Sequence, residues 1–323
     1  MLHSTSSRGF LGFHRATAAF VVVQVILLAI SVTGFLQLGL DFDWRELLTG
    51  QIWVIGLFWV MWALHARTPA RDRREWVVSE TFLVIALLLT FSLIGSPLQY
   101  VILEMRMPLA DNWLAGVDSL IGVHVPTLVA WTAAHPRLAF VLVAAYGSLL
   151  PQFVLPPLLL GCWYRDRGAL WEYAWHFQVC LIATLLGLVL LPAAHVFSHY
   201  RFEPLIDETR FITQFAAIRS GTMTIIHPHE LEGMIEFPSF HAAGGLLITW
   251  AFRRYRPWAV ALGVLNLLMI AATVLCGVHY VVDLLASFLI FAASVCLWRR
   301  LGIRWIEPAT NIDRLLDTRV MAA

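Results

Sequence analysis

The stretch PWAVALGVLNLLMIAATVLCGVHYVVDLLASFLIFAASVCLW, residues 257–298, decides the fold class. It contains one aspartate, Asp283, and no other acidic residue, arginine or lysine. A helix needs about 20 mostly apolar residues to cross a bilayer, so the stretch is long enough for two spans joined by the Gly-Val pair in its middle. We therefore expect membrane helices at 257–277 and 279–298.

The composition of the whole chain supports a membrane protein. Hydrophobic residues make up 59% of the 323 residues, charged residues make up 13%, and the mean hydropathy is +0.75. A soluble domain carries about 25% charged residues, so a soluble globule is excluded, as are a disordered chain and a coiled coil. The net charge of +1 gives no indication of a nucleic-acid partner. All 22 basic residues are arginines, so any permanent cation must be an arginine.

The same length criterion predicts an all-α fold, a polytopic transmembrane helix bundle of about eight spans. The sixth span is short, because Glu236 and Arg253 bound it, and we expect its outer end to be recessed in protein. Residues 1–76 would hold two extra N-terminal helices, residues 77–300 a six-helix core and residues 301–323 a cytoplasmic tail. The eight spans are predicted at about 16–40, 47–66, 77–99, 138–162, 174–197, 238–252, 257–277 and 279–298.

Arginine positions predict the orientation, because cytoplasmic loops collect positive charge. With the N-terminus inside, 16 arginines fall on the cytoplasmic side and six fall outside. Both termini are then cytoplasmic, and the two longest connections, 104–137 and 198–237, lie outside. We expect an amphipathic helix on the outer membrane surface at about 109–121. The polar segment 198–237 is expected to be an active-site loop, because long loops are often functional.

The first candidate motif is EFPSFHAA, residues 236–243. Proline followed by serine favours a helix start, because proline suits the first turn and Ser239 can cap free amides. His241 then lies in the first turn, where backbone N–H groups and the helix dipole attract an anion. The alternative is an ordinary helix start with an interfacial histidine.

The second candidate motif is GVHYVVD, residues 277–283. His279 and Asp283 are four residues apart, so they share one helix face. The carboxylate can orient the imidazole and stabilise its cation, as in a nucleophile–base–orienter relay. An ionisable group inside an apolar span usually faces a polar cavity. The alternative is a structural ion pair between two helices. Both motifs fall on the outer face of the predicted topology.

The two motifs resemble elements of the type 2 phosphatidic acid phosphatase superfamily. PSFH at 238–241 resembles its Pro-Ser-x-His element, and HYVVD at 279–283 resembles its His-x-x-x-Asp element. The stretch 237–283 is similar to the branch that includes inositol phosphorylceramide synthase, the aureobasidin-resistance protein, and its bacterial relatives. YGSLLPQ at 146–152 and RSGT at 219–222 are also similar to that branch. The resemblance covers roughly residues 78–300 and implies an enzyme of a bacterial plasma membrane.

The resemblance also implies a mechanism that requires no metal and no other cofactor. His279 attacks phosphorus and becomes a phosphohistidine, while Asp283 holds His279 in the correct tautomer. His241 protonates the leaving alkoxide and later deprotonates the acceptor. Ser239, the helix-start amides and an arginine bind the phosphoryl oxygens.

The chain departs from the superfamily's pattern at its cations. The first element of the superfamily is a Lys and Arg-Pro signature, and RMP at 106–108 is its nearest match here. Ala272 and Thr273 stand where the superfamily has Ser-Arg. Arg219 is therefore the first candidate for binding phosphate, and Arg106 is the second. The alternative for each is a solvated or headgroup-bound arginine.

Three further side chains are candidates for lining the substrate cavity. Tyr146 and Gln152 lie in the fourth span, where helix-to-helix hydrogen bonding is an equal alternative. Asp111 shares one face of the surface helix with Asp118, which favours exposure of both to solvent. A separate hypothesis is a metal site on His195 and His199 joined by other histidines; no carboxylate or cysteine completes it convincingly. Those other histidines are His227 and His229.

The leading functional prediction is an integral membrane enzyme that acts on lipid phosphates or phosphodiesters at the non-cytoplasmic face. Membrane lipids would be its partners. Water as the acceptor gives a phosphatase, and a lipid or polyol hydroxyl gives a head-group transferase. A transporter is disfavoured because two related halves with broken helices are not visible. A noncatalytic scaffold is disfavoured by the intact serine, histidine and aspartate set.

Overall fold

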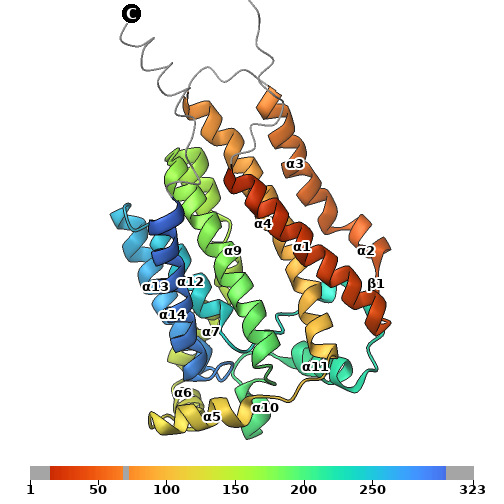
Figure 1. Cartoon of the computed structure of the whole chain (residues 1–323). Coiled ribbons are helices and arrows are strands. Elements are labelled where there is room, and N and C mark those ends of the chain that lie inside the picture. Colours follow the sequence, from red (N-terminus) through yellow and green to blue (C-terminus); the bar gives the residue numbers. More distant parts are fainter. Residues whose placement is uncertain (1–14, 68–72, 303–323) are drawn as a thin grey trace, which may run out of the picture.

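The computed structural model describes residues 15–67 and 73–302 of the chain. The described chain is helical almost throughout, and its two short strands are β1 (Asp41–Phe42) and β2 (Ile225–Ile226). Five described helices are long and apolar enough to cross a membrane, and two bent helix pairs raise that number to seven. The prediction of an all-α membrane bundle is therefore confirmed (Figure 1).

The predicted spans correspond to helices of three kinds. The long apolar helices are α1 (Arg15–Leu38), α4 (Arg73–Glu104), α9 (Arg167–Leu190), α13 (Arg256–Leu275) and α14 (Val281–Leu297), which is continued by η3 (Trp298–Gly302). Shorter apolar helices form the second and sixth predicted spans, as α3 (Gln51–Arg67) and α12 (Phe240–Ala251). The fourth is bent by 42° and consists of α7 (Pro136–Gly147), α8 (Leu149–Gln152) and η1 (Pro157–Trp163).

Prolines explain the bend in the fourth span. Pro151, Pro156 and Pro157 lie at or beside its breaks. Each proline removes a backbone N–H donor, and its ring clashes with the carbonyl one turn earlier. The helix therefore cannot continue straight through this segment, and its last part is wound as a π-helix.

The helix α9 begins at Arg167, earlier than the predicted start of the fifth span. The hydropathy criterion left residues 167–173 out of the predicted span because they include charged side chains. In the structure, these charged side chains are paired. Arg167 bonds Glu80 of α4 at 2.6 and 2.9 Å, and Glu172 bonds Arg253 at 2.8 and 3.0 Å. A buried charge is tolerated in such a place when it has a hydrogen-bonded partner.

The helices pack in a continuous series across the bundle. Both α1 and α3 pack on α4, α4 packs on α9, and α9 packs on α12 and α14. The series ends with α13 between α12 and α7. In Figure 1 the N-terminal pair therefore lies on one side and the C-terminal helices on the other, with α9 between them.

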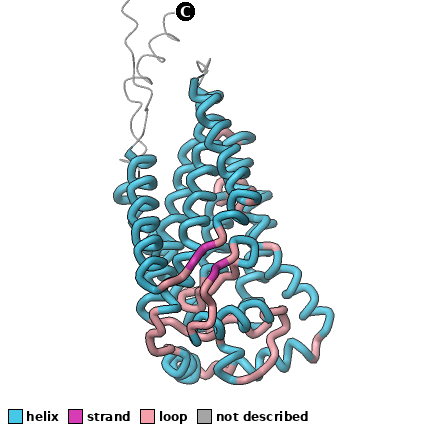
Figure 2. The backbone as a smooth tube through the Cα atoms, turned by 90° about the vertical axis from the view of Figure 1, so that its right-hand side faces the viewer, coloured by secondary structure: helices cyan, strands magenta, loops and turns pink. Residues whose placement is uncertain are grey.

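Short helices and loops gather at one end of the bundle. Figure 2 shows this concentration of loops, with the two parallel strands close above it. The pair α5 and α6 is bent by 79°, and α5 occupies the segment where a surface helix is expected. The short helices here are α2 (Trp44–Thr49), α5 (Asp111–Leu120), α6 (Val125–Ala133), α10 (Val196–Tyr200), α11 (Thr209–Ser220) and η2 (Pro228–Glu230).

The arginine distribution predicts that this loop-rich end is non-cytoplasmic. A cysteine at Glu203, which is exposed in the loop after α10, should react with an impermeant maleimide in intact cells. A cysteine at Arg165, exposed at the opposite end before α9, should react only after lysis. The wild-type chain gives the background labelling of its four cysteines. If only the Arg165 variant is labelled in intact cells, the orientation is the opposite of the predicted one.

Candidate active site

A tight turn between α13 and α14 positions His279. Gly277 has a φ of +85°, which glycine adopts without the cost other residues meet. A Cβ at Gly277 would also lie 2.5 Å from the ring of Phe202. The backbone N–H groups of Val278 and His279 both donate to the carbonyl of Thr273 at 2.9 Å. The turn therefore holds His279 at the start of α14.

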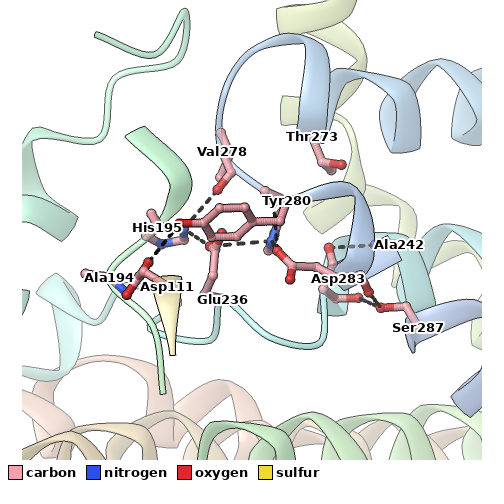
Figure 3. A network of polar contacts seen from close by, with 12 residues as sticks. Asp111, Ala194, His195, Glu236, Ala242, Thr273, Val278, Tyr280, Asp283 and Ser287 are labelled. Atoms are coloured by element: carbon pink, nitrogen blue, oxygen red, sulfur yellow. Dashed lines mark hydrogen bonds and ion pairs between the residues drawn. The ribbon is translucent and has the colours of Figure 1, made fainter. Parts of the chain in front are cut away.

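Asp283 holds the imidazole of His279 from one turn along α14. The distance from His279 Nδ1 to Asp283 Oδ2 is 3.2 Å, and the same oxygen accepts the Tyr280 N–H at 2.9 Å (Figure 3). His279 is 1% exposed and Asp283 is fully buried. Because Nδ1 faces the carboxylate, Nε2 is the nitrogen available to react with a substrate.

The second motif places His241 beside this pair. Ser239 caps α12, since its Oγ accepts the Ala242 N–H at 3.2 Å. The His241 ring stacks on Tyr146, with centroids 4.4 Å apart, and its centroid lies 6.0 Å from that of His279. Both His241 and Tyr146 are partly exposed. The two motifs thus meet as the sequence predicted, with His241 on the more open side of His279.

The structure adds Glu236 and His195, which sequence reasoning did not assign to this site. Glu236 is fully buried, and its Oε2 lies 3.5 Å from His279 Nδ1. The same oxygen contacts His195 Nδ1, which also lies 3.0 Å from the Val278 carbonyl. The signal was present for Glu236, because this acidic residue lies two positions before the PSFH motif at the start of a span. No local spacing links His195 to either motif.

His195 occupies a strained backbone position. Its φ is +70°, a region that residues with a Cβ seldom adopt. Such strain costs about 1–3 kcal/mol and persists only where surrounding contacts enforce it. Here the contacts with Glu236 and Val278 fix the imidazole, and its ring lies against Phe211 with centroids 3.9 Å apart.

Burial sets the protonation of the groups outside the helices. It lowers the pKa of His279 well below its ordinary value, and the neighbouring His195 and His241 lower it further. Burial also lowers the pKa of His195 to about 3. The pKa of Glu236 is raised well above its ordinary value, first by burial and then by the charge of Asp283. Burial beside Asp283 therefore favours the protonated form of Glu236.

Two acidic residues of α5 support the site from outside, and the expectation that they are exposed is wrong. Asp118 is 1% exposed and accepts the N–H groups of Val281 and Val282, both at 2.9 Å. Asp111 is 6% exposed and accepts the Ala194 N–H and the Tyr280 hydroxyl. Asp111 thus lies beside the site through Tyr280. Both carboxylates turn inward because the free amides at the start of α14 and before α10 require acceptors.

The two candidate phosphate-binding residues, Arg106 and Arg219, lie close to each other. Arg106 bonds Glu104 at 2.6 Å and is half exposed, and its guanidinium packs against Gly221. Burial and the charge of Arg106 lower the pKa of Arg219, whose Nη1 is buried without a hydrogen bond. Within residues 15–67 and 73–302, no arginine forms a hydrogen bond or ion pair with His241 or His279.

The remaining candidate residues form contacts away from His279 and His241. Gln152 bonds Ser148 at 2.9 Å within its own bent helix. The His199 ring packs against Tyr200 and Tyr280, while His227 and His229 lie beside Asp43 and Glu46. The four histidines considered for one metal site therefore do not form one. Among described groups, ligand atoms of Glu236, His279 and Asp283 lie within 4.8 Å of one another, so this buried cluster could also hold a cation.

The comparison with known families agrees with these motifs. A family model described as the PAP2 superfamily matches residues 112–297, more than half of the chain. The chain belongs to the PAP2 superfamily. This confirms the predicted superfamily, whose members are in general phosphatases and phosphotransferases. No curated protein and no solved structure matches the chain.

The raised pKa of Glu236 predicts a specific pH dependence of stability. A raised carboxyl pKa stabilises the fold fully below the ordinary value of 4.5, and this contribution is lost as the pH rises through the raised value. Glu236→Gln cannot ionise, so its thermal midpoint should rise relative to wild type between pH 5 and pH 8. Differential scanning fluorimetry in detergent measures this difference.

The exposed Glu230→Gln variant, in the same loop, is the matched control for a lost carboxylate. An equal trend in both variants, or a constant difference for Glu236→Gln across this range, would contradict a raised pKa for Glu236.

Proposed function

We propose that this protein is an integral membrane phosphatase or phosphotransferase that acts on lipid phosphates or phosphodiesters through a phosphohistidine on His279. One observation carries the proposal: Asp283 holds His279 Nδ1 at 3.2 Å, and His241 lies beside the same ring. A nucleophile, its orienting carboxylate and a second histidine are the groups that covalent phosphoryl transfer requires. Membership of the PAP2 superfamily supports this chemistry.

In the first step, His279 Nε2 attacks phosphorus. The N–P bond forms while the bond from phosphorus to the leaving oxygen breaks. His241 donates a proton to that oxygen, so that an alcohol leaves. In the second step, His241 takes a proton from the acceptor hydroxyl, which attacks phosphorus and releases His279. Water as the acceptor completes hydrolysis, and a lipid or polyol hydroxyl completes head-group transfer.

Glu236 and Asp283 explain how the intermediate is stabilised. Phosphorylation at Nε2 leaves Nδ1–H in place, so the imidazole ring gains positive charge. Asp283 Oδ2 and Glu236 Oε2 lie 3.2 and 3.5 Å from that nitrogen. Carboxyl groups fixed in a buried site stabilise such charge without reorganising at the moment of reaction.

The phosphoryl oxygens are assigned to the start of α12. Its free amides and the Ser239 hydroxyl lie next to His241, and a helix start attracts anions. Arg106 and Arg219 lie together at the loop-rich end and are assigned to attracting the anionic lipid rather than to holding the transferred group. By the arginine bias, this end is non-cytoplasmic and meets lipids of the outer leaflet.

A panel of radiolabelled lipid phosphates and phosphodiesters tests the function with the full chain in detergent–lipid micelles. We expect release of phosphate, or transfer of a phosphorylated head group to an added hydroxyl acceptor, and complete loss of either in His279→Ala. Product analysis distinguishes the two acceptors. Turnover by His279→Ala equal to that of wild type would overturn the proposal.

The two histidines should differ in their effect on the intermediate. His279→Ala should abolish acid-labile phosphoenzyme in quenched-flow trapping. His241→Ala should slow its formation by about 10²–10⁴-fold with lipid substrates. The same variant should be partly rescued by p-nitrophenyl phosphate, whose leaving group needs no proton. Phosphate trapped on His279→Ala but not on His241→Ala would show that His241 is the nucleophile and His279 the proton donor.

A further inference from the structure

A second cluster of titratable side chains lies away from the candidate active site. The strands β1 and β2 pair in parallel, with Asp41 opposite Ile225 and Phe42 opposite Ile226. The Asp43 N–H continues the pairing by donating to the Ile226 carbonyl at 3.0 Å. This register places Asp43 and the short helix α2 beside the residues that follow β2. It joins the connection between α1 and α3 to the loop 198–237.

The donor atoms of this cluster face one another. His227 Nδ1 lies 3.5 Å from Asp43 Oδ2 and 3.4 Å from Glu46 Oε2, and His229 Nδ1 contacts Glu46 Oε1. The two His227 distances exceed the usual range of a hydrogen bond, about 2.7–3.2 Å. They match the edge of a tetrahedron around a zinc ion, about 3.3 Å for ligand distances near 2.0 Å. Ligand atoms of Asp43, Glu46 and His227 lie within 4.8 Å of one another.

The hydrogen bonds leave these donors available for an ion. Asp43 uses Oδ1 to cap α2 at the Glu46 N–H, at 3.1 Å, and this leaves Oδ2 toward His227. Glu46 Oε2 is buried and has no hydrogen bond. The two carboxylates balance the charge of a divalent cation, and the imidazoles supply uncharged nitrogen ligands. Glu230, whose carboxylate lies 3.6 Å from His229 Nε2, adds a third acidic group at the rim.

We propose that Asp43, Glu46 and His227 bind a divalent transition-metal ion, with His229 as a further imidazole beside Glu46; zinc suits this ligand set and spacing. The ion would fasten the segment around α2 to the loop 198–237. That loop continues directly to Glu236 and the start of α12, so the site would restrain the loop that carries a buried group of the active site. The role is structural and separate from the chemistry at His279.

The test uses the full chain, purified without a polyhistidine tag, stripped with chelator and then supplied with zinc. We expect about one zinc per chain by mass spectrometry of the metal after dialysis. Zinc should raise the thermal midpoint, because an ion that binds only the folded state stabilises it. His227→Ala and Glu46→Gln should each weaken zinc binding at least about 10-fold and remove the thermal shift. The milder Glu46→Gln keeps the test valid if the histidine variant does not fold.

His124→Ala, an exposed histidine of the same end of the bundle, is the matched control and should keep the zinc. Equal zinc affinity in wild type, His227→Ala and Glu46→Gln would overturn the proposal. Loss of zinc from His279→Ala, with zinc retained by His227→Ala, would also overturn it and place the ion in the cluster of Glu236, His279 and Asp283. Cobalt in place of zinc should give the intense visible absorption of a tetrahedral site in wild type and His124→Ala, but not in His227→Ala or Glu46→Gln.

Discussion

The loop-rich end of this bundle depends on keeping two carboxyl groups buried around one imidazole nitrogen. Glu236 and Asp283 are both fully buried and both face His279 Nδ1. Burying an isolated carboxylate is costly, so each needs a proton or a hydrogen-bonded partner. Asp283 receives the Tyr280 N–H and Glu236 contacts His195. These contacts fix the α13–α14 turn, the start of α12 and the segment after α9 relative to one another.

The same requirement explains how α5 is attached to the rest of the protein, since its buried face carries Asp111 and Asp118. Asp118 accepts two free amides at the start of α14, and Asp111 joins Ala194 to the Tyr280 hydroxyl. Acidic side chains are favourable at a helix start because of the helix dipole. The helix α5 therefore supports the start of α14, next to the turn that carries His279.

Much of the fold was predictable from the sequence because membrane crossing imposes a length on apolar segments. Eight predicted spans correspond to described helices. The prediction failed at the start of α9, where Arg167 and Glu172 are paired with residues of other helices. It also gave no bend in the fourth span, where prolines interrupt the helix. At the candidate site, the spacing of four predicted the contact of His279 with Asp283, although His279 lies in the turn just before α14 and not on the helix itself.

The sequence by itself determined the class of fold, the approximate positions of the apolar helices and the two motifs, because each of these follows from local composition or spacing. Only the tertiary structure decided which distant residues meet. Glu236 and His195 reach His279 from separate segments, and Asp118 reaches α14 across more than 160 residues. The grouping of Asp43 and Glu46 with His227 and His229 depends on a strand pairing that no local sequence pattern predicts. Such contacts arise from packing, in which buried polar groups from distant segments must satisfy one another.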